Sequence, residues 1–268
     1  MTELLQVPAE AFAGMAAASL LCIAIPIAAA IFWKKKHKNT SLITLLAGAV
    51  TFTVFAMILE QLLHMVMLPV VSGSSVLYVI YGALAAGVFE ETGRFVTFKL
   101  FLKKTTAGGD PDNAVMFGIG HGGTEAVLLI GVTMGLSYIP MCAMANSGML
   151  TPEMIGDEAT YETVVTQINL LAGYSFFDFM TMVLERVLAI AAHIAMSVFV
   201  FRAANDRKRL WMFPATILVH VLIDVPAAMF QVGVLPLWVA HIGLVVCDVI
   251  MVIAAVRIYK AMKAEMKQ

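Results

Sequence analysis

Eight ionisable side chains stand inside hydrophobic stretches of this sequence, at spacings that would let them act together. They are Glu90, Glu91, Arg94, His121, Glu125, His193, His220 and Asp224. Three pairs are four residues apart, which places their members on one face of a helix: Glu90–Arg94, His121–Glu125 and His220–Asp224. Charged groups in apolar helices are costly and usually face a protein interior or a cavity. This pattern predicts a buried functional site.

Adjacent carboxylates beside imidazoles suit hydrolysis. Glu90 could act as the general base on a water molecule, with Glu91 as its near partner, while His121 and His220 donate to an oxyanion. Alternatively, His121, His193 and His220 could hold a divalent metal ion such as zinc, which activates the water. The zinc-protease motif His-Glu-x-x-His is absent from the sequence. The residues alone leave both alternatives open.

The depth of these residues in their helices strengthens the prediction. Counting the helical rise inward from the polar residues that bound each stretch gives ~13 Å for Glu90 and His193, ~12 Å for His121 and ~16 Å for His220. Four groups from four helices therefore share one layer. Glu125 and Asp224 lie about one helical turn beyond it. Asp248 falls near the same depth without a partner on its own helix, and Glu60 with His64 is expected to form a pair near the outer surface.

The elements that position this layer are long apolar helices. Of the 268 residues, 61% are hydrophobic and 13% are charged, with a net charge of −1. This composition excludes a soluble fold and gives no reason to expect a nucleic-acid partner. We predict an all-α membrane helix bundle in which about seven stretches cross the lipid bilayer. They are Ala11–Trp33, Ser41–Val70, Ser75–Leu102, Ala114–Met141, Phe177–Phe201, Leu210–Phe230 and Leu235–Tyr259.

Basic residues orient the bundle. The chain has 17 Lys and Arg residues, and all but Arg94 and Arg186 fall in four clusters near residues 34–38, 99–104, 202–209 and 257–267. The alternate loops carry neither residue type. Positive charge stays in the cytosol, so the N-terminus is expected outside and the C-terminus inside. The expected location is the plasma membrane of a bacterium, as a multi-pass protein.

The one sizeable outer segment covers residues 142–175. Thr151 and Pro152 resemble a helix start, and apolar residues then repeat at helical spacing from Tyr161 to Leu171 before Gly173. We expect an amphipathic helix lying in the membrane interface. A lid over the bundle is the alternative.

The motifs together resemble a known family. Glu90-Glu91-Thr92-Gly93-Arg94, Phe117-x-x-x-His121 followed by Gly122-Gly123-Thr124-Glu125, His193 and His220-x-x-x-Asp224 resemble the YhfC family of intramembrane proteases. That family is similar to the CAAX and bacteriocin-processing proteases and the PrsW proteases. The chain departs from the CAAX pattern by one residue before Arg94, and by Asp224 in place of Asn. Both departures argue against a prenyl-protein substrate.

The resemblance implies a role for each residue. Glu90 would be the water-activating base, with Glu91 beside it and Arg94 pairing with the carboxylates. His121 and His220 would be metal ligands or oxyanion donors, Asp224 would support His220, and His193 would be a further member. Glu125, one turn from His121, is expected to support that imidazole.

We therefore expect one integral membrane domain over residues 1–268, with the motifs in a core of about residues 75–230. The expected activity is that of an intramembrane endopeptidase of the glutamic or metallo type, acting on a membrane protein or peptide. A proton- or ion-coupled transporter and a non-catalytic scaffold or immunity protein are the alternatives.

Overall fold

The computed structural model describes residues 4–105 and 107–267, and in these residues every regular element is helical. The long helices are α1 (Ala9–Lys36), α2 (Leu42–Val54), α3 (Gln61–Val71), α4 (Ser75–Val96), α5 (Asp112–Ala126), α9 (Phe176–Asn205), α10 (Met212–Gln231) and α11 (Leu237–Glu265). Shorter α-helices are α6 (Ile139–Asn146), α7 (Pro152–Ile155) and α8 (Glu158–Ala172). The π-helical and 3-10 segments are η1 (Phe55–Glu60), η2 (Thr97–Phe101), η3 (Leu102–Lys104), η4 (Val127–Tyr138) and η5 (Arg207–Arg209). The predicted all-α class is confirmed.

Each of the seven predicted stretches is helical along most of its length, and in two of them a π segment joins neighbouring α-helices without a break. Thus α2, η1 and α3 together form Leu42–Val71. Among the described residues, six helices are long and apolar enough to cross a membrane. The stretch that begins with α4 is not among them, and it carries Glu90, Glu91 and Arg94. The number of crossings and the orientation of the termini therefore stay predictions.

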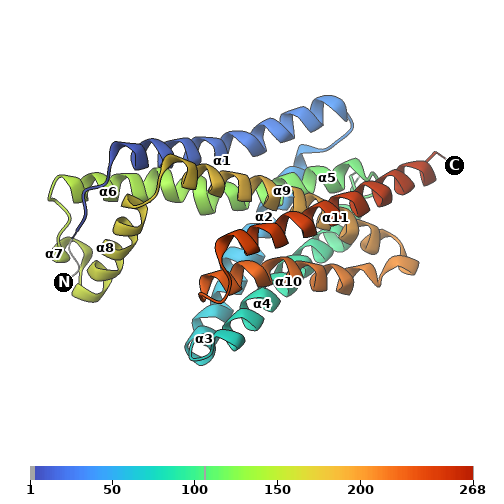
Figure 1. Cartoon of the computed structure of the whole chain (residues 1–268). Helices are drawn as coiled ribbons and strands as arrows, with labels where there is room; N and C mark the ends of the chain where they lie inside the picture. The colour runs from blue at the N-terminus through green and yellow to red at the C-terminus, as the bar shows by residue number, and fades with distance from the viewer. Residues whose placement is uncertain (1–3, 106, 268) are drawn as a thin grey trace. The chain divides into compact units, whose positions relative to one another are not determined.

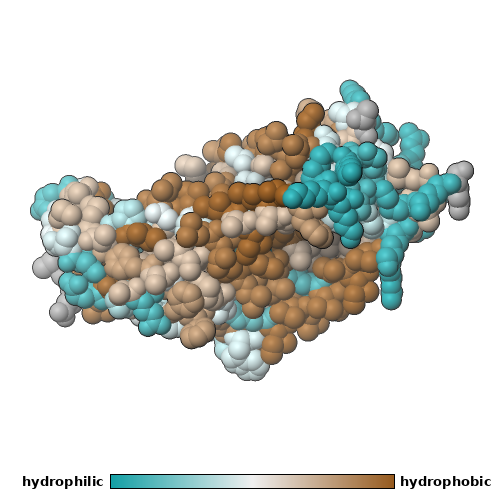
Figure 2. Space-filling view, turned by 90° about the horizontal axis from the view of Figure 1, so that it is seen from above, coloured by the Kyte–Doolittle hydropathy of each residue, from teal (hydrophilic) through white to brown (hydrophobic). Residues whose placement is uncertain are grey.

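Apolar side chains cover most of the face seen in Figure 2. Large hydrophobic residues are more than half exposed on several helices, such as Ile43 at 66%, Leu218 at 60% and Ile250 at 63%. In water such a surface would drive association, whereas in a bilayer it contacts lipid. The surface therefore fits the predicted membrane protein.

The helices divide into two units. One comprises residues 1–25 and 125–187, and the other residues 26–124 and 188–268. In the second unit α4 packs against α2, α3 and α10, and α10 also packs against α11 (Figure 1). The face of α4 that carries the paired carboxylates is therefore covered by its neighbours.

Glycines on α5 allow neighbouring helices of this unit to approach closely. A Cβ on Gly118 would lie 2.5 Å from the Cα of Ile194 in α9. A Cβ on Gly120 would overlap the carbonyl oxygen of Leu45 in α2. Small residues are the usual means by which membrane helices bring their backbones together. Here they draw α2 and α9 against the helix that carries His121.

The outer segment holds two helices where the sequence predicted one. α7 begins at Pro152 as expected but ends at Ile155. It ends there because Gly156 takes a φ of 114°, a backbone conformation that residues with a Cβ rarely adopt. Asp157 then caps α8, accepting a hydrogen bond from the backbone N–H of Thr160 at 2.9 Å. The predicted apolar side is correct, since Val165, Ile168 and Leu171 are buried.

Candidate active site

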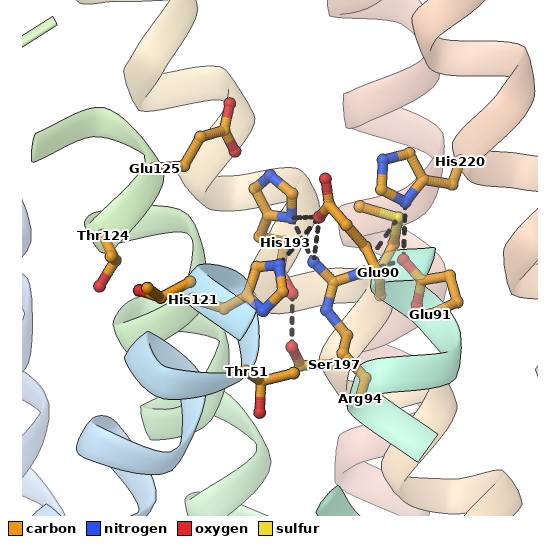
Figure 3. A network of polar contacts seen from close by, with 12 residues as sticks. Thr51, Glu90, Glu91, Arg94, His121, Thr124, Glu125, His193, Ser197 and His220 are labelled. Carbon is orange, nitrogen blue, oxygen red and sulfur yellow. Dashed lines mark hydrogen bonds and ion pairs between the residues drawn. The ribbon is translucent and has the colours of Figure 1, made fainter. Parts of the chain in front are cut away.

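The site begins with the adjacent carboxylates on α4. Glu91 is fully buried, while Glu90 keeps 7% of its surface exposed. Arg94, one turn further along α4 and also fully buried, lies between them (Figure 3). Its Nη1 donates to Oε1 of Glu91, and its Nη2 lies 3.4 Å from Oε2 of Glu90. One guanidinium therefore partly offsets two carboxylates that the surrounding helices remove from water.

Glu90 reaches two histidines on two other helices. Its Oε2 lies 2.8 Å from Nε2 of His121 on α5 and 3.8 Å from Nδ1 of His193 on α9. Arg94 Nη2 also donates to Nδ1 of His193. Because a guanidinium has no acceptor, this ring nitrogen must offer its lone pair to the cluster. Glu90, His121 and His193 thus form one arm of the site.

Glu91 reaches the third histidine, on α10. Its Oε1 lies 2.7 Å from Nδ1 of His220, and the other ring nitrogen of His220 lies 3.4 Å from Oδ2 of Asp224. The imidazole is therefore held between two carboxylates from different helices. Glu91, His220 and Asp224 form the other arm. The ring centroids of His193 and His220 are 5.9 Å apart, so the two arms meet.

The imidazoles are fixed by their surroundings as well as by hydrogen bonds. Phe52 packs edge-on against His121 with the ring centroids 5.3 Å apart. Gly122 leaves room for His193, because a Cβ there would lie 2.9 Å from both the Cβ of His193 and its ring carbon Cδ2. The buried hydroxyl of Ser197 donates to the backbone carbonyl of His193 at 2.7 Å. These contacts restrict how far either ring can turn.

Glu125, expected to support His121, forms an ion pair with Arg186. Both residues belong to the unit formed by residues 1–25 and 125–187. Its predicted role toward His121 stays a prediction. The pair gives Arg186 the charge-neutralising partner that an arginine within an apolar helix requires.

Two further acidic residues lie near the site. Asp248 on α11 is 2% exposed, interacts electrostatically with His193, and has no hydrogen-bond partner for either oxygen among the described residues. Glu60 is 6% exposed, bonds His64 at 3.2 Å, and lies within electrostatic range of Glu90 and His220. Asp248 was signalled by its depth. The predicted Glu60–His64 pair is present, and its position near the outer surface of the membrane stays a prediction. The burial of Glu60 comes from the packing of η1 against α4.

Three of these side chains could hold a metal ion. One donor atom each from Glu90, His121 and His193 lies within 4.8 Å of the others, and all three residues are buried. Two imidazoles and a carboxylate are a donor set that zinc takes in hydrolytic enzymes. To use Nε2, His121 would move its proton to Nδ1, which has no hydrogen-bond partner in the described part of the chain. The residues fit a small divalent ion, provided that Arg94 withdraws toward Glu91.

Of the three predicted metal candidates, the structure groups His121 and His193 with Glu90. His220 is instead held by Glu91 and Asp224. The sequence could suggest that the histidines share a depth. Only the helix packing shows which carboxylate each histidine meets.

A known protein matches this chain over nearly its whole length. It is 32% identical, over 262 residues, to the uncharacterized membrane protein YhfC of Bacillus subtilis (strain 168), a match that covers 96% of this chain and 97% of the relative. No solved structure matches it. The model of the YhfC intramembrane metalloprotease family matches residues 21–246, which include both arms of the site. The chain therefore belongs to the YhfC intramembrane metalloprotease family.

Proposed function

We propose that this protein is an intramembrane endopeptidase that hydrolyses peptide bonds of membrane-embedded or membrane-adjacent substrates. The observation that carries the proposal is the buried cluster of Glu90, His121 and His193, whose donor atoms lie within 4.8 Å of one another. Buried acid–imidazole clusters in membrane helices are costly, and they are usually kept for function. The family description supports the metal-dependent form of this chemistry.

Glu90, His121 and His193 would hold a divalent ion. When bound, such an ion polarises a substrate carbonyl and makes a water molecule acidic enough to attack it near neutral pH. Glu90 is the more accessible of the two adjacent carboxylates, with 7% of its surface exposed. In the absence of an ion, the same carboxylate is placed to take a proton from water. Glu90 is the central residue in either form.

The Glu91 arm is suited to proton transfer. His220 Nδ1 donates to Glu91 Oε1 at 2.7 Å, and Asp224 lies beside Nε2 at 3.4 Å. Only a doubly protonated imidazole can donate to both carboxylates at once. Such an imidazolium can pass its Nε2 proton to the amine that leaves when the peptide bond breaks. Asp224, with 34% of its side chain exposed, would orient this nitrogen.

The test joins metal analysis of the purified protein with cleavage of membrane peptides in liposomes. Glu90→Gln keeps the shape of the side chain but removes its charge. We therefore expect the rate of cleavage to fall at least ~100-fold, which is the usual effect of removing a group that stabilises the transition state. We expect less bound zinc as well. Glu265→Gln is the control, since this carboxylate of the same unit pairs with Arg202 and contacts no residue of the site. It should keep its metal and most of its activity.

Two results would contradict the proposal. One is normal cleavage by Glu90→Gln and His121→Ala. The other is ion flux across liposomes that depends on Glu90 without any cleavage, which would favour the transporter. Wild-type cleavage without bound metal would retain the peptidase and remove only its metal-dependent form.

A further inference from the structure

A groove on the second unit lies away from the carboxylates of the site. It has a volume of about 350 Å³ and is formed by α1, α5, α9 and α11. Its wall consists of aliphatic side chains: Val115, Ala191, Ile194, Val198, Val252 and Val256. Val252 and Val256 are 36% and 43% exposed, so the groove is open along α11. It shares no residue with the candidate active site.

One end of the groove is polar and aromatic. Trp33, Lys36 and His37 line it at the C-terminal end of α1, and Tyr259 and Lys260 line it near the end of α11. Trp and Tyr concentrate where the hydrocarbon of a bilayer meets the headgroups. From Lys260 back to Val252 the groove follows α11 for ~12 Å, at the rise of a helix. The groove thus runs from the level of the headgroups into the hydrocarbon.

The charge at this end is not neutralised by the protein. Among the described residues, no ion pair within 4.0 Å includes Lys36 or Lys260. The nearby carboxylate of Asp112 is already taken by His37 at 3.0 Å and by Lys263 at 3.0 Å. Tyr259 also donates to it. Two exposed lysines are therefore left to meet an anion from outside the protein.

We propose that this groove is a binding site for an anionic phospholipid. One acyl chain lies along the aliphatic wall, and the phosphate of the headgroup meets Lys36 and Lys260, with Trp33 and Tyr259 beside the glycerol region. Basic pockets between membrane helices are known to bind anionic headgroups in this way. A bilayer supplies this ligand to both ends of the groove at once. A free phosphate would leave the aliphatic wall uncovered.

The test measures thermal unfolding of the full-length protein in uncharged detergent as phosphatidylglycerol is added, together with native mass spectrometry of retained lipid. We expect a saturable rise in the unfolding midpoint with phosphatidylglycerol. A much smaller rise is expected with phosphatidylcholine of the same chain length. Inorganic phosphate and glycerol phosphate are the headgroup-only arms, and they should have little effect.

Two substitutions separate the charge from the apolar wall. Lys36→Gln with Lys260→Gln should weaken the apparent affinity for phosphatidylglycerol about 10- to 30-fold, since each lysine near an anionic surface contributes up to about fivefold. Ala191→Phe fills the groove without changing charge and should weaken both lipids. Lys103→Gln with Lys104→Gln is the matched control, because these exposed lysines do not line the groove. That double variant should bind like the wild type.

Each other outcome would overturn the proposal. Equal effects of the two lipids would show that the lysines do not select an anion. A full effect of glycerol phosphate would show that the acyl chain is not bound. Equal losses in both double-lysine variants would indicate a general effect of surface charge. A dimer that dissociates in Ala191→Phe would show that a second copy of the chain fills the groove.

Discussion

Among single residues, Arg94 contacts both arms of the site. It bonds Glu91, and it also bonds Glu90 and His193, which are two of the three residues proposed to hold the metal. A buried guanidinium that touches the donor atoms of a metal site acts as the cation of that site when no ion is bound. Its charge keeps Glu90 and Glu91 from facing each other unpaired.

We therefore expect Arg94→Met to destabilise the metal-free protein by about 3–5 kcal/mol, the usual effect of removing one partner from a buried ion pair. Saturating zinc should recover about 2–3 kcal/mol, since a ligand at 100 times its Kd stabilises the folded state by that amount. Unfolding in detergent, with and without zinc, measures both effects. Arg257→Met, an exposed arginine, should change stability by less than about 0.5 kcal/mol. If zinc gives Arg94→Met no more protection than it gives the wild type, Arg94 does not compete with the ion.

Replacing Asp248 is expected to raise the stability of the protein, which is the opposite of the effect expected for Arg94. Its carboxylate is 2% exposed, and neither oxygen has a hydrogen-bond partner in the described part of the chain. Asp248→Leu removes both polar atoms, so the free energy of unfolding should rise by about 1–3 kcal/mol. Asp110→Leu, which removes a partner of Lys263 at 3.1 Å, should lower it. If Asp248→Leu instead loses stability and bound zinc, the carboxylate is needed to hold His193.

At this scale the sequence predicts contacts within a helix better than contacts between helices. The pairs Glu90–Arg94 and His220–Asp224 follow from helical periodicity, and the structure places both at 3.4 Å. The bonds that build the two arms, Glu90 to His121 and Glu91 to His220, join α4 to α5 and α10. No periodicity within one helix encodes the rotation of another helix, so these bonds could not be assigned from spacing.

Close helix packing is what holds the site at the scale of elements, and glycine substitutions test it. Gly122→Ala would place a Cβ 2.9 Å from the imidazole carbon Cδ2 of His193, and Gly118→Ala would press on the backbone of Ile194. Each should destabilise the protein by about 1–3 kcal/mol, as overpacking does. Gly122→Ala should also weaken zinc binding ~10-fold or more, the usual effect of disturbing a ligand's support. Unfolding and zinc titration measure the two effects.

Gly82→Ala is the control for these glycines. It lies on α4 with nothing within 4 Å of its added Cβ. There the substitution should stabilise the helix by about 0.5–1 kcal/mol, because alanine has less backbone freedom to lose on folding than glycine has. If all three variants lose similar stability, close approach is not the reason for glycine on α5.

The helices of the outer segment, α7 and α8, show which features of an element can be predicted from sequence and which cannot. The apolar repeat from Tyr161 to Leu171 located α8 correctly. The break between α7 and α8 at Gly156 depends on a positive φ, which could not be predicted from the composition of this segment. Asp157 restarts the chain as a helix cap, and hydrogen bonds from Thr160 lower the pKa of its carboxyl. A group with a lowered folded-state pKa stabilises the fold above its unfolded pKa and loses that effect as the pH falls.

The first turn of α8 should therefore exchange its amide hydrogens several-fold faster in Asp157→Ala at neutral pH. The difference from the wild type should disappear in acid, once the carboxyl is protonated in both the folded and unfolded states. Hydrogen exchange followed by mass spectrometry resolves this segment. Asp206→Ala, which removes a similar cap at η5, is the control, and it should leave α8 unchanged.

For the whole molecule, the decisive question is whether the stretch that begins with α4 crosses the bilayer. Six crossings by the other apolar helices of the described residues would return the chain to the side on which it began. The distribution of Lys and Arg instead predicts termini on opposite sides. Polar residues of this stretch are enclosed by neighbouring helices, so its low hydropathy does not forbid a crossing.

We expect Ser72→Cys to react with a membrane-impermeant thiol reagent added outside intact cells, and Thr105→Cys to react only after lysis. Both positions are exposed. Of the native cysteines, Cys22 and Cys142 are buried and Cys247 is partly buried, so each variant is made in a Cys247→Ser background that is labelled in parallel. Labelling of both positions from the same side would show that this stretch does not cross, and would place Glu90 and Glu91 in a re-entrant helix.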